Sequence, residues 1–384
     1  MSFEFATANR ILFGPGTAAE VGPAAAGLGR HAFMLTSDDP SRADPVLASL
    51  RAAGLAVTLF PVTAEPTTSL VQAATAAAAS ASCDCIVGVG GGSVIDAGKA
   101  VAALLTNGGE PLDYLEVIGR GQPLSRPSAP CIAVPTTAGT GAEVTRNAVL
   151  ASPEHRQKVS LRSPTMLPVL AVVDPELTYS LPPAVTASTG LDALTQVMEP
   201  YVALQANPMT DALCREGIAR AARGLRRAYQ DGQDAAARED MALASLFGGL
   251  ALANARLGAV HGFAGVIGGM FPAPHGVICA QLLPFVMATN VAALRARAPY
   301  SPALAKYDEI ARLVTGDAAA RAADGVAWVQ ALCTDLAVPR LGSYGVTPAD
   351  FAGIVAKSQS ASSMKGNPIA LTVEELVAIL EEAV

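Results

Sequence analysis

Residues that could bind a metal ion gather in two short stretches of the second half of the chain. His261 and His275 each precede a glycine in a Gly- and Pro-rich segment, and Asp192 lies earlier, four residues before Gln196. Residues four apart share one face of a helix. A carboxylate and two imidazoles form a three-ligand divalent site with one position open for a substrate oxygen. We therefore predict that Asp192, His261 and His275 are metal ligands and the catalytic residues, with Gln196 as a further candidate ligand.

Each of these residues also has a simpler interpretation. A single imidazole among apolar neighbours is most often a hydrogen-bonded core residue. Gln196 could be a weak carbonyl ligand, could hold a water on the metal, or could simply bond to Asp192. The glycines around the two histidines are costly inside a helix, so this segment is a poor helix by composition. The predicted site depends on side chains that are distant in sequence meeting in the fold.

A glycine-rich turn in the first half indicates a second kind of chemistry. Residues 85–99 run from an apolar strand through consecutive glycines into a helix. Gly91 and Gly92 let backbone N–H groups approach a pyrophosphate, the helix N-terminus adds positive charge, and Ser93 can donate a further hydrogen bond. The segment matches neither the spaced dinucleotide fingerprint nor a P-loop, and a plain strand-to-helix turn is the alternative.

Hydroxyl-bearing residues follow another expected strand, at 131–135. In an open α/β sheet, ligands bind at the carboxyl ends of the strands. The candidate cofactor contacts in this segment are Thr136, Thr137 and Thr140.

A carboxylate follows the first expected strand. Asp38 is placed where it could hold an adenosine ribose, which favours NAD while leaving NADP open. The alternative is that Asp38 or Asp39 shapes a turn before Pro40.

The elements that must position these residues change in kind along the chain. The first half alternates short apolar runs with Ala-rich helical stretches, which indicates a parallel sheet flanked by helices. Strands are expected at 32–36, 56–60, 85–90, 131–135 and 169–174, helices at 45–53 and 69–81, and an opening hairpin or edge strand within 3–13.

After Asp174-Pro175 the pattern contains long periodic segments and no convincing strand. Prolines at 175, 182 and 183 interrupt both kinds of element, so we predict an α/β domain at 1–178 and an all-α domain at 179–384. The expected helices of the second domain are 182–204, 207–230, 235–257, 276–295, 301–314, 319–336, 347–358 and 373–383.

Composition narrows the class of protein. The 384 residues suit two domains, and the formal net charge of −7 without Lys/Arg clusters argues against a nucleic-acid partner. We find no long uninterrupted apolar run and no signal peptide, so we expect no membrane partner and a cytoplasmic location. The six cysteines are scattered in apolar stretches and are expected to be reduced core thiols.

Together these motifs resemble the iron-containing, or group III, alcohol dehydrogenases. The resemblance covers nearly the whole chain and rests on Gly-Gly-Gly-Ser with Asp96 and Lys99, Pro-Thr-Thr-Ala-Gly-Thr-Gly-Ala-Glu-Val-Thr, Asp174-Pro175-Glu176, the Asp192 helix, His261-Gly, Pro-His275-Gly and Lys365-Gly-Asn-Pro. It implies a dehydroquinate synthase-like fold, in which an α/β N-terminal dinucleotide-binding domain precedes an all-α C-terminal domain. It also implies a cleft holding cofactor and metal, and a homodimer or larger homo-oligomer.

Carried over position by position, the resemblance places metal ligands at Asp192, His261 and His275. It departs at Gln196, where most members carry a further histidine ligand, and at Gly265, where many carry an active-site histidine. The neutral amide weakens the case for Fe²⁺ and makes the site similar to the zinc site of glycerol dehydrogenases, so Fe²⁺ and Zn²⁺ both remain candidates. The nicotinamide dinucleotide contacts fall at Gly91, Gly92, Ser93, Thr136, Thr137, Thr140 and Lys158, and we include Asp96 of the same glycine motif.

We therefore expect an NAD(P)-dependent, metal-dependent oxidoreductase of small alcohols, aldehydes or ketones. Three alternatives remain. A maleylacetate reductase-like enzyme would need histidine motifs that are missing. A dehydroquinate synthase-like lyase would need several basic residues for a phosphorylated substrate, and Arg256 and Lys365 are the main ones near the ligand motifs. The third alternative is a dinucleotide-binding protein that has lost its metal.

Overall fold

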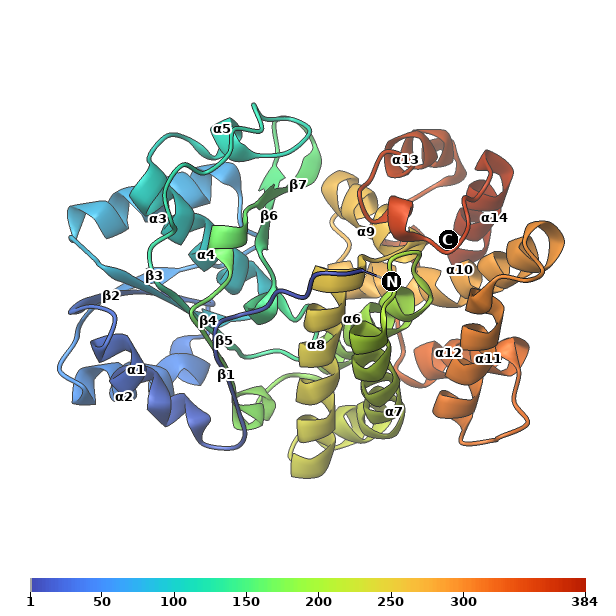
Figure 1. The fold of residues 1–384 in the computed structure, drawn as a ribbon, viewed down its shortest axis with the longest axis horizontal. Coiled ribbons are helices and arrows are strands. Elements are labelled where there is room, and N and C mark those ends of the chain that lie inside the picture. Colours follow the sequence, from blue (N-terminus) through green and yellow to red (C-terminus); the bar gives the residue numbers. More distant parts are fainter. Residues whose placement is uncertain (1) are drawn as a thin grey trace. The chain divides into compact units, whose positions relative to one another are not determined.

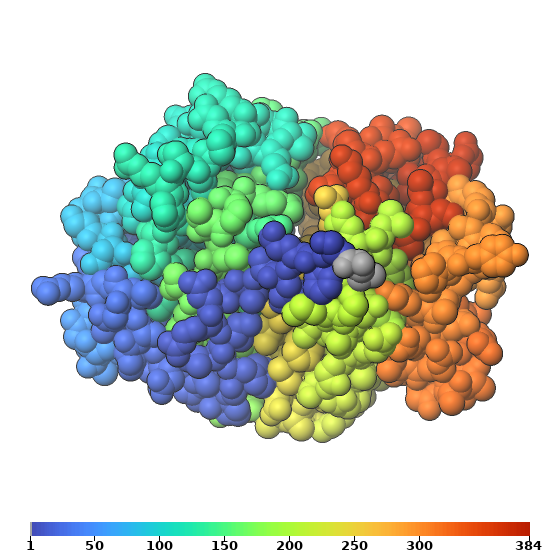
Figure 2. Space-filling model, in the orientation of Figure 1, coloured from blue at the N-terminus to red at the C-terminus, as the bar shows by residue number. Residues whose placement is uncertain are grey.

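The computed structural model describes residues 2–384, which divide into two compact units (Figure 1). The first unit is Ala6–Ser180. The second is Leu181–Val384 together with the N-terminal residues up to Phe5. The first described residues, in dark blue, lie on the surface of this second unit beside its yellow-green helices (Figure 2).

A six-stranded parallel sheet forms the centre of the first unit. Its order is β1-β8-β5-β4-β2-β3, and every neighbouring pair is parallel. The strands β2, β4 and β5 end at one edge, because Thr36 pairs with Val89 and Gly90 pairs with Pro135. The strands are β1 (Ile11–Phe13), β2 (His31–Thr36), β3 (Ala56–Pro61), β4 (Cys85–Gly90), β5 (Cys131–Pro135) and β8 (Leu170–Val173).

Helices cover both faces of this sheet. Alternate residues of β2 point to opposite faces, so Met34 packs into one core with α1 and α2, and Phe33 packs into the other with α3 and α4. This arrangement explains the apolar runs of the central strands, which are buried on both sides. The helices are α1 (Val21–Ala26), α2 (Asp44–Ala52), α3 (Thr68–Ser80), α4 (Gly92–Asn107) and α5 (Pro111–Tyr114).

An antiparallel hairpin in the first unit is absent from the sequence-based expectation. It is formed by β6 (Asn147–Ser152) and β7 (Gln157–Arg162). Asp96 of α4 ties it down by accepting a hydrogen bond from the Val149 N–H at 2.9 Å.

The residues Leu181–Val384, all of them described, contain helices and no strand. Helix α6 is central, because α7, α8 and α10 all pack against it. The helices are α6 (Pro183–Val202), α7 (Pro208–Gln230), α8 (Ala235–Ala255), α9 (Ala259–Met270), α10 (His275–Arg297), α11 (Pro302–Thr315), α12 (Ala322–Asp335), α13 (Phe351–Ser358) and α14 (Val373–Ala383).

One of these helices was not expected from the sequence. The glycine-rich segment before His275 forms α9, although its composition is unfavourable for a helix. Close packing explains one of its glycines, since a Cβ on Gly262 would lie 2.9 Å from the Cε of Met364. Helix α10 is long and apolar enough to cross a membrane, but 72% of its most apolar window is buried, as in the core helix of a soluble fold.

Candidate metal centre

Four potential ligands from three helices converge in the helical unit. They are Asp192 of α6, His261 of α9, and His275 and Cys279 of α10, and their ligand atoms all lie within 4.8 Å of one another. Asp192 Oδ1 is 3.3 Å from His261 Nε2 and 3.8 Å from His275 Nε2. Cys279 Sγ is 3.9 Å from His261 Nε2 and 3.7 Å from His275 Nε2. The structure therefore brings the three predicted ligands together and adds a thiol.

Close approach of α10 to α6 positions two of these donors. A Cβ on Gly276 would overlap the backbone carbonyl oxygen of Ser188, so the first turn of α10 lies directly against α6 one turn before Asp192. His275 is the first residue of α10, and Cys279 follows four residues later on the same face.

The charges around this cluster favour a cation. Asp192 Oδ1 is buried and has no hydrogen-bond partner among the described residues, a state that costs about 1–3 kcal/mol unless something satisfies it. Burial raises the pKa of Asp192, but His275 and His261 outweigh it and leave the pKa below its usual value. Burial lowers the pKa of His261, but Cys279, Asp192 and Glu199 hold it well above the ordinary value. An orphaned carboxylate oxygen among nitrogen and sulfur donors fits a divalent metal ion.

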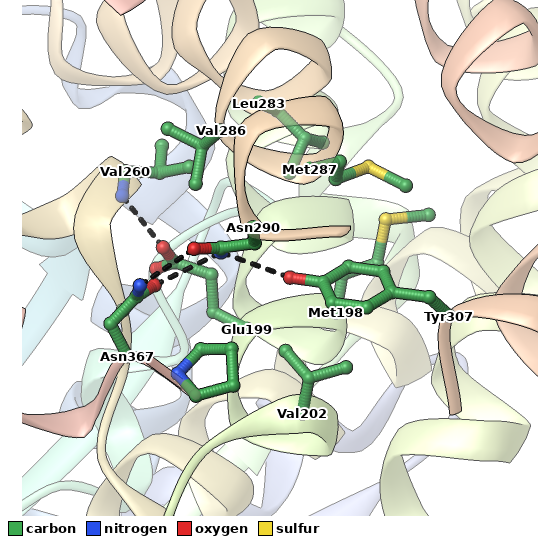
Figure 3. Close-up of a pocket in the computed structure, with 12 residues that line it drawn as sticks. Met198, Glu199, Val202, Val260, Leu283, Val286, Met287, Asn290, Tyr307 and Asn367 are labelled. Atoms are coloured by element: carbon green, nitrogen blue, oxygen red, sulfur yellow. Dashed lines mark hydrogen bonds between the residues drawn. The ribbon is translucent and has the colours of Figure 1, made fainter. Parts of the chain in front are cut away.

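Glu199, also on α6, fixes the orientation of His261. Its Oε2 accepts from His261 Nδ1 at 2.7 Å, and its Oε1 accepts from the Val260 N–H at 2.7 Å (Figure 3). Because a carboxylate can only accept, Nδ1 keeps its proton, and Nε2 is the nitrogen that would release a proton and offer its lone pair to a metal ion. A carboxylate behind a histidine ligand is the usual arrangement that orients metal-binding imidazoles.

An asparagine pair holds the start of α9 in place. Asn367 Oδ1 accepts from the Ala259 N–H at 3.1 Å, and Asn290 and Asn367 bond to each other through both side chains (Figure 3). The pocket beside them has a volume of about 10 Å³, room for about one water molecule. It is therefore too small to be the substrate site.

The two positions that depart from the family pattern lie on α6 and α9. Gln196 is buried one turn after Asp192, and its Nε2 would be 3.5 Å from a Cβ on Gly248 of α8. Gly265 has open space around its Cβ position.

In the first unit, the two segments predicted to bind the dinucleotide contact each other. A Cβ on Gly92 would lie 2.6 Å from Thr140 Oγ1, and one on Gly91 would lie 3.3 Å from Thr137 Oγ1. Gly91 is the N-cap of α4, so no side chain caps this end of the helix. Ser93 lies in the first turn of the same helix. Such a helix end attracts phosphate.

Thr136 and Asp38 lie at the same carboxyl edge as this turn. The Thr136 N–H donates to the Gly90 carbonyl at 2.9 Å. Asp39 caps the short turn at Pro40–Ala43 by accepting from the Ser41 N–H, whereas Asp38 is an exposed carboxylate just beyond β2. Asp38 also accepts from the Asp39 N–H at 3.1 Å, so both carboxylates bond within this turn.

The other two predicted cofactor residues have partners within the protein. Asp96 forms a 2.9 Å ion pair with the buried Lys99, in addition to its bond with Val149. Lys158 of β7 forms an ion pair with Glu65.

Sequence reasoning missed Cys279 and Glu199. Both carry a positional signal: Cys279 is four residues after His275, and Glu199 is seven residues after Asp192, so each shares a helix face with a predicted ligand. Both residues lie in apolar segments, which favoured their interpretation as ordinary core residues over a role in the metal site.

Comparison with known families covers both units. Residues 8–175 match the family model described as iron-containing alcohol dehydrogenase, and residues 186–384 match the C-terminal model of the Fe-containing alcohol dehydrogenase family. A relative, the 1,3-propanediol dehydrogenase of Klebsiella pneumoniae, is 37% identical over 394 residues, covering 99% of this chain and 98% of its own.

Solved structures share the fold. The crystal structure of a 1,3-propanediol oxidoreductase matches with a TM-score of 0.92 at 34% identity, covering 100% of both chains. A sulfoacetaldehyde reductase from Bifidobacterium kashiwanohense, solved in complex with NAD+, matches with a TM-score of 0.87 at 27% identity, covering 100% of this chain and 99% of its own. The expected fold class, an α/β domain followed by an all-α domain, is confirmed.

Proposed function

The chain belongs to the iron-containing alcohol dehydrogenase family, and from this premise we propose that it interconverts small primary alcohols or diols and their aldehydes with NAD(H). The likeness to 1,3-propanediol dehydrogenase supports this substrate class. The observation that carries the proposal is that Asp192, His261 and His275 converge, and that the Oδ1 atom of Asp192 is buried there without a hydrogen-bond partner.

Asp192, His261 and His275 would hold a divalent ion, Fe²⁺ or Zn²⁺, whose Lewis acidity lowers the pKa of an alcohol hydroxyl and polarises a carbonyl. The His275 side chain is 34% exposed, whereas that of Asp192 is 4% exposed. The substrate oxygen therefore approaches on the His275 side. The buried Asp192 and the Glu199–His261 pair keep the donors fixed while substrate enters and leaves.

The dinucleotide is assigned to the N-terminal domain at 1–178 and the metal and substrate to the domain at 179–384. Gly91, Gly92 and Ser93 would receive the pyrophosphate at the N-terminus of α4, and Asp38 would hold the ribose, which favours NAD over NADP. Thr136, Thr137 and Thr140 line the same sheet edge. Asp96 would support the cofactor site by fixing α4 through its ion pair with Lys99. Lys158 would support it by fixing the β6–β7 hairpin through its ion pair with Glu65.

Composition and family support a proposal for where the enzyme is located, how it assembles and what it binds. We place it in the cytoplasm as a homodimer or larger homo-oligomer, with a small-molecule substrate and neither nucleic acid nor membrane as partner. The net charge of −7 supports the absence of a nucleic-acid partner.

A reconstitution screen tests this function. Metal-free protein is loaded separately with Fe²⁺ or Zn²⁺ and offered short alcohols, 1,3-diols, aldehydes and keto acids with NAD(H) or NADP(H), while the nicotinamide absorbance is followed. We expect a net absorbance change that needs added metal, with alcohols or aldehydes and NAD(H). The Asp192→Ala protein is the matched inactive control. Turnover without net cofactor change, as in a lyase, or no metal-dependent turnover with any of these substrates, would overturn the proposal.

A further inference from the structure

We propose that the thiolate of Cys279 is the fourth protein ligand of the metal centre, which makes it an Asp-His-His-Cys site suited to Zn²⁺. The inference deepens the proposed function and shares with it only the premise that this centre binds a divalent ion. It assigns to Cys279 the place of the fourth ligand, which a third imidazole at position 196 would otherwise take.

The distances between donor atoms match a tetrahedral zinc site. With ordinary zinc bond lengths, a tetrahedron separates oxygen and nitrogen donors by about 3.3 Å and sulfur and nitrogen donors by about 3.6 Å. Asp192 Oδ1 lies 3.3 and 3.8 Å from the two imidazole nitrogens, and Cys279 Sγ lies 3.7 and 3.9 Å from them. Shifts of a few tenths of an ångström would bring all four donors within bonding distance of one ion, and zinc can expand to five-coordinate when a substrate oxygen binds.

The surroundings of Cys279 set it apart from the other thiols. All six cysteines are free, and Cys279 is the one that lies among metal-binding side chains in the described part of the chain. Cys131, for comparison, lies in the apolar core, where burial raises its pKa to about 12, as expected for an inert thiol. Cys279 instead points its sulfur at two imidazoles and lies beside the unpartnered Asp192 Oδ1.

The donor set determines which metal the site prefers. A thiolate is a soft ligand that favours Zn²⁺ over the harder Fe²⁺, and two imidazoles with a carboxylate are common partners of zinc. The neutral amide of Gln196 is a weaker donor than a thiolate, an imidazole or a carboxylate. When the ion binds, the Sγ–H bond breaks, the proton leaves to solvent and an Sγ–metal bond forms, without any change in oxidation state.

Cobalt substitution and X-ray absorption test the assignment. Wild-type protein loaded with one equivalent of Co²⁺ should show a thiolate-to-cobalt charge-transfer band in the near ultraviolet. The Cys279→Ser protein should lack the band, and chelator competition should show its zinc affinity reduced more than about 100-fold, beyond the loss typical of an outer-shell partner. Cys333→Ser is the matched control, because Cys333 Sγ bonds to the Ala280 carbonyl of α10 at 3.3 Å and lies outside the donor cluster.

Wild-type measurements keep the test decisive even if Cys279→Ser fails to fold. Zinc absorption fine structure should show one sulfur scatterer at about 2.3 Å. A bound metal with only nitrogen and oxygen neighbours, or a cobalt band that persists in Cys279→Ser, would overturn the assignment. A protein with the sulfur neighbour but no alcohol turnover would refute the proposed function alone, and active protein without the sulfur would refute this inference alone.

Discussion

At the scale of single residues, Glu199 offers the most direct test of how the centre is held. Its two carboxylate oxygens receive the Nδ1–H of His261 and the Val260 N–H, both at 2.7 Å. In Glu199→Gln one of these donors would face an amide N–H₂ group, so the imidazole would lose its fixed orientation. We expect metal affinity to fall about 10- to 100-fold, measured by competition with a chromophoric chelator.

Glu309→Gln is the control for this substitution. Glu309 lies on α11 and is bonded to Tyr201 and Arg215, so the variant should bind metal like wild type. Equal affinities in both variants would contradict the role of Glu199.

Residue type alone predicted part of this centre. Histidine and aspartate are rare in apolar segments, so Asp192, His261 and His275 stood out, and the structure places them together. Cys279 did not stand out because a buried cysteine is ordinarily a small apolar side chain. Its proposed role rests on the way α6, α9 and α10 bring their side chains together, which the spacing of Cys279 and His275 along the sequence does not specify.

At the scale of elements, Gly276 sets how closely α10 approaches α6. Its missing side chain lets the helix lie on the Ser188 carbonyl, which brings His275 to Asp192. Gly276→Ala should force the helices apart, destabilising the protein by about 1–3 kcal/mol and weakening metal binding. Chemical denaturation and chelator competition measure the two effects.

Gly265→Ala is the matched comparison for that substitution. Gly265 lies inside α9 with open space at its Cβ position, so alanine should be neutral or stabilise the protein by about 0.5–1 kcal/mol. If Gly276→Ala were as well tolerated as Gly265→Ala, close helix approach would not be what positions the donors.

Glu143, in the short turn Ala142–Val144, links the first unit's stability to pH. Burial raises its pKa to about 7 from 4.5, although its backbone N–H and the neighbouring Lys99 oppose the shift. The folded state therefore binds more protons than the unfolded state between these values, and stability falls as pH rises from about 4.5 to about 7.

Glu143→Gln should remove this dependence. The amide cannot ionise, so the variant should lose less stability than wild type between pH 5 and pH 8, by at most about 3 kcal/mol. Denaturant titrations at several pH values measure the difference. Exposed Glu65→Gln is a control that leaves the buried carboxyl in place, and parallel pH curves for wild type and Glu143→Gln would show that Glu143 is ionised in the fold.

The elements that the sequence predicted well are those with strong local patterns. The strands β2, β4 and β5 are apolar runs buried on both faces, and the predicted strand at 85–90 coincides with β4. The β6–β7 hairpin was missed because the apolar residues of β6 are consecutive and do not alternate with polar ones, and because its position depends on Asp96 of α4. Helix α9 was missed because its glycine content disfavours a helix, and the contact of Gly262 with Met364 is a tertiary one that no local pattern shows.

At the scale of the whole molecule, the two proposed binding functions belong to separate units. Every proposed dinucleotide contact lies within Ala6–Ser180, and every proposed metal ligand lies within Leu181–Val384. Damage to one site should therefore leave binding at the other nearly unchanged, although alcohol oxidation requires both.

A pair of reciprocal variants tests this separation. His275→Ala removes a donor of the centre and should abolish metal retention and turnover while the affinity for NAD stays within about twofold of wild type, since sites in different units are expected to be additive. Gly92→Val places branched carbons against Thr140, whose Oγ1 would be 2.6 Å from the new Cβ, and should abolish NAD binding while one metal ion is retained. Calorimetric titration with NAD and elemental analysis measure the two properties independently. Loss of NAD binding in His275→Ala, or of metal in a folded Gly92→Val protein, would mean that the cofactor and metal sites are coupled rather than independent.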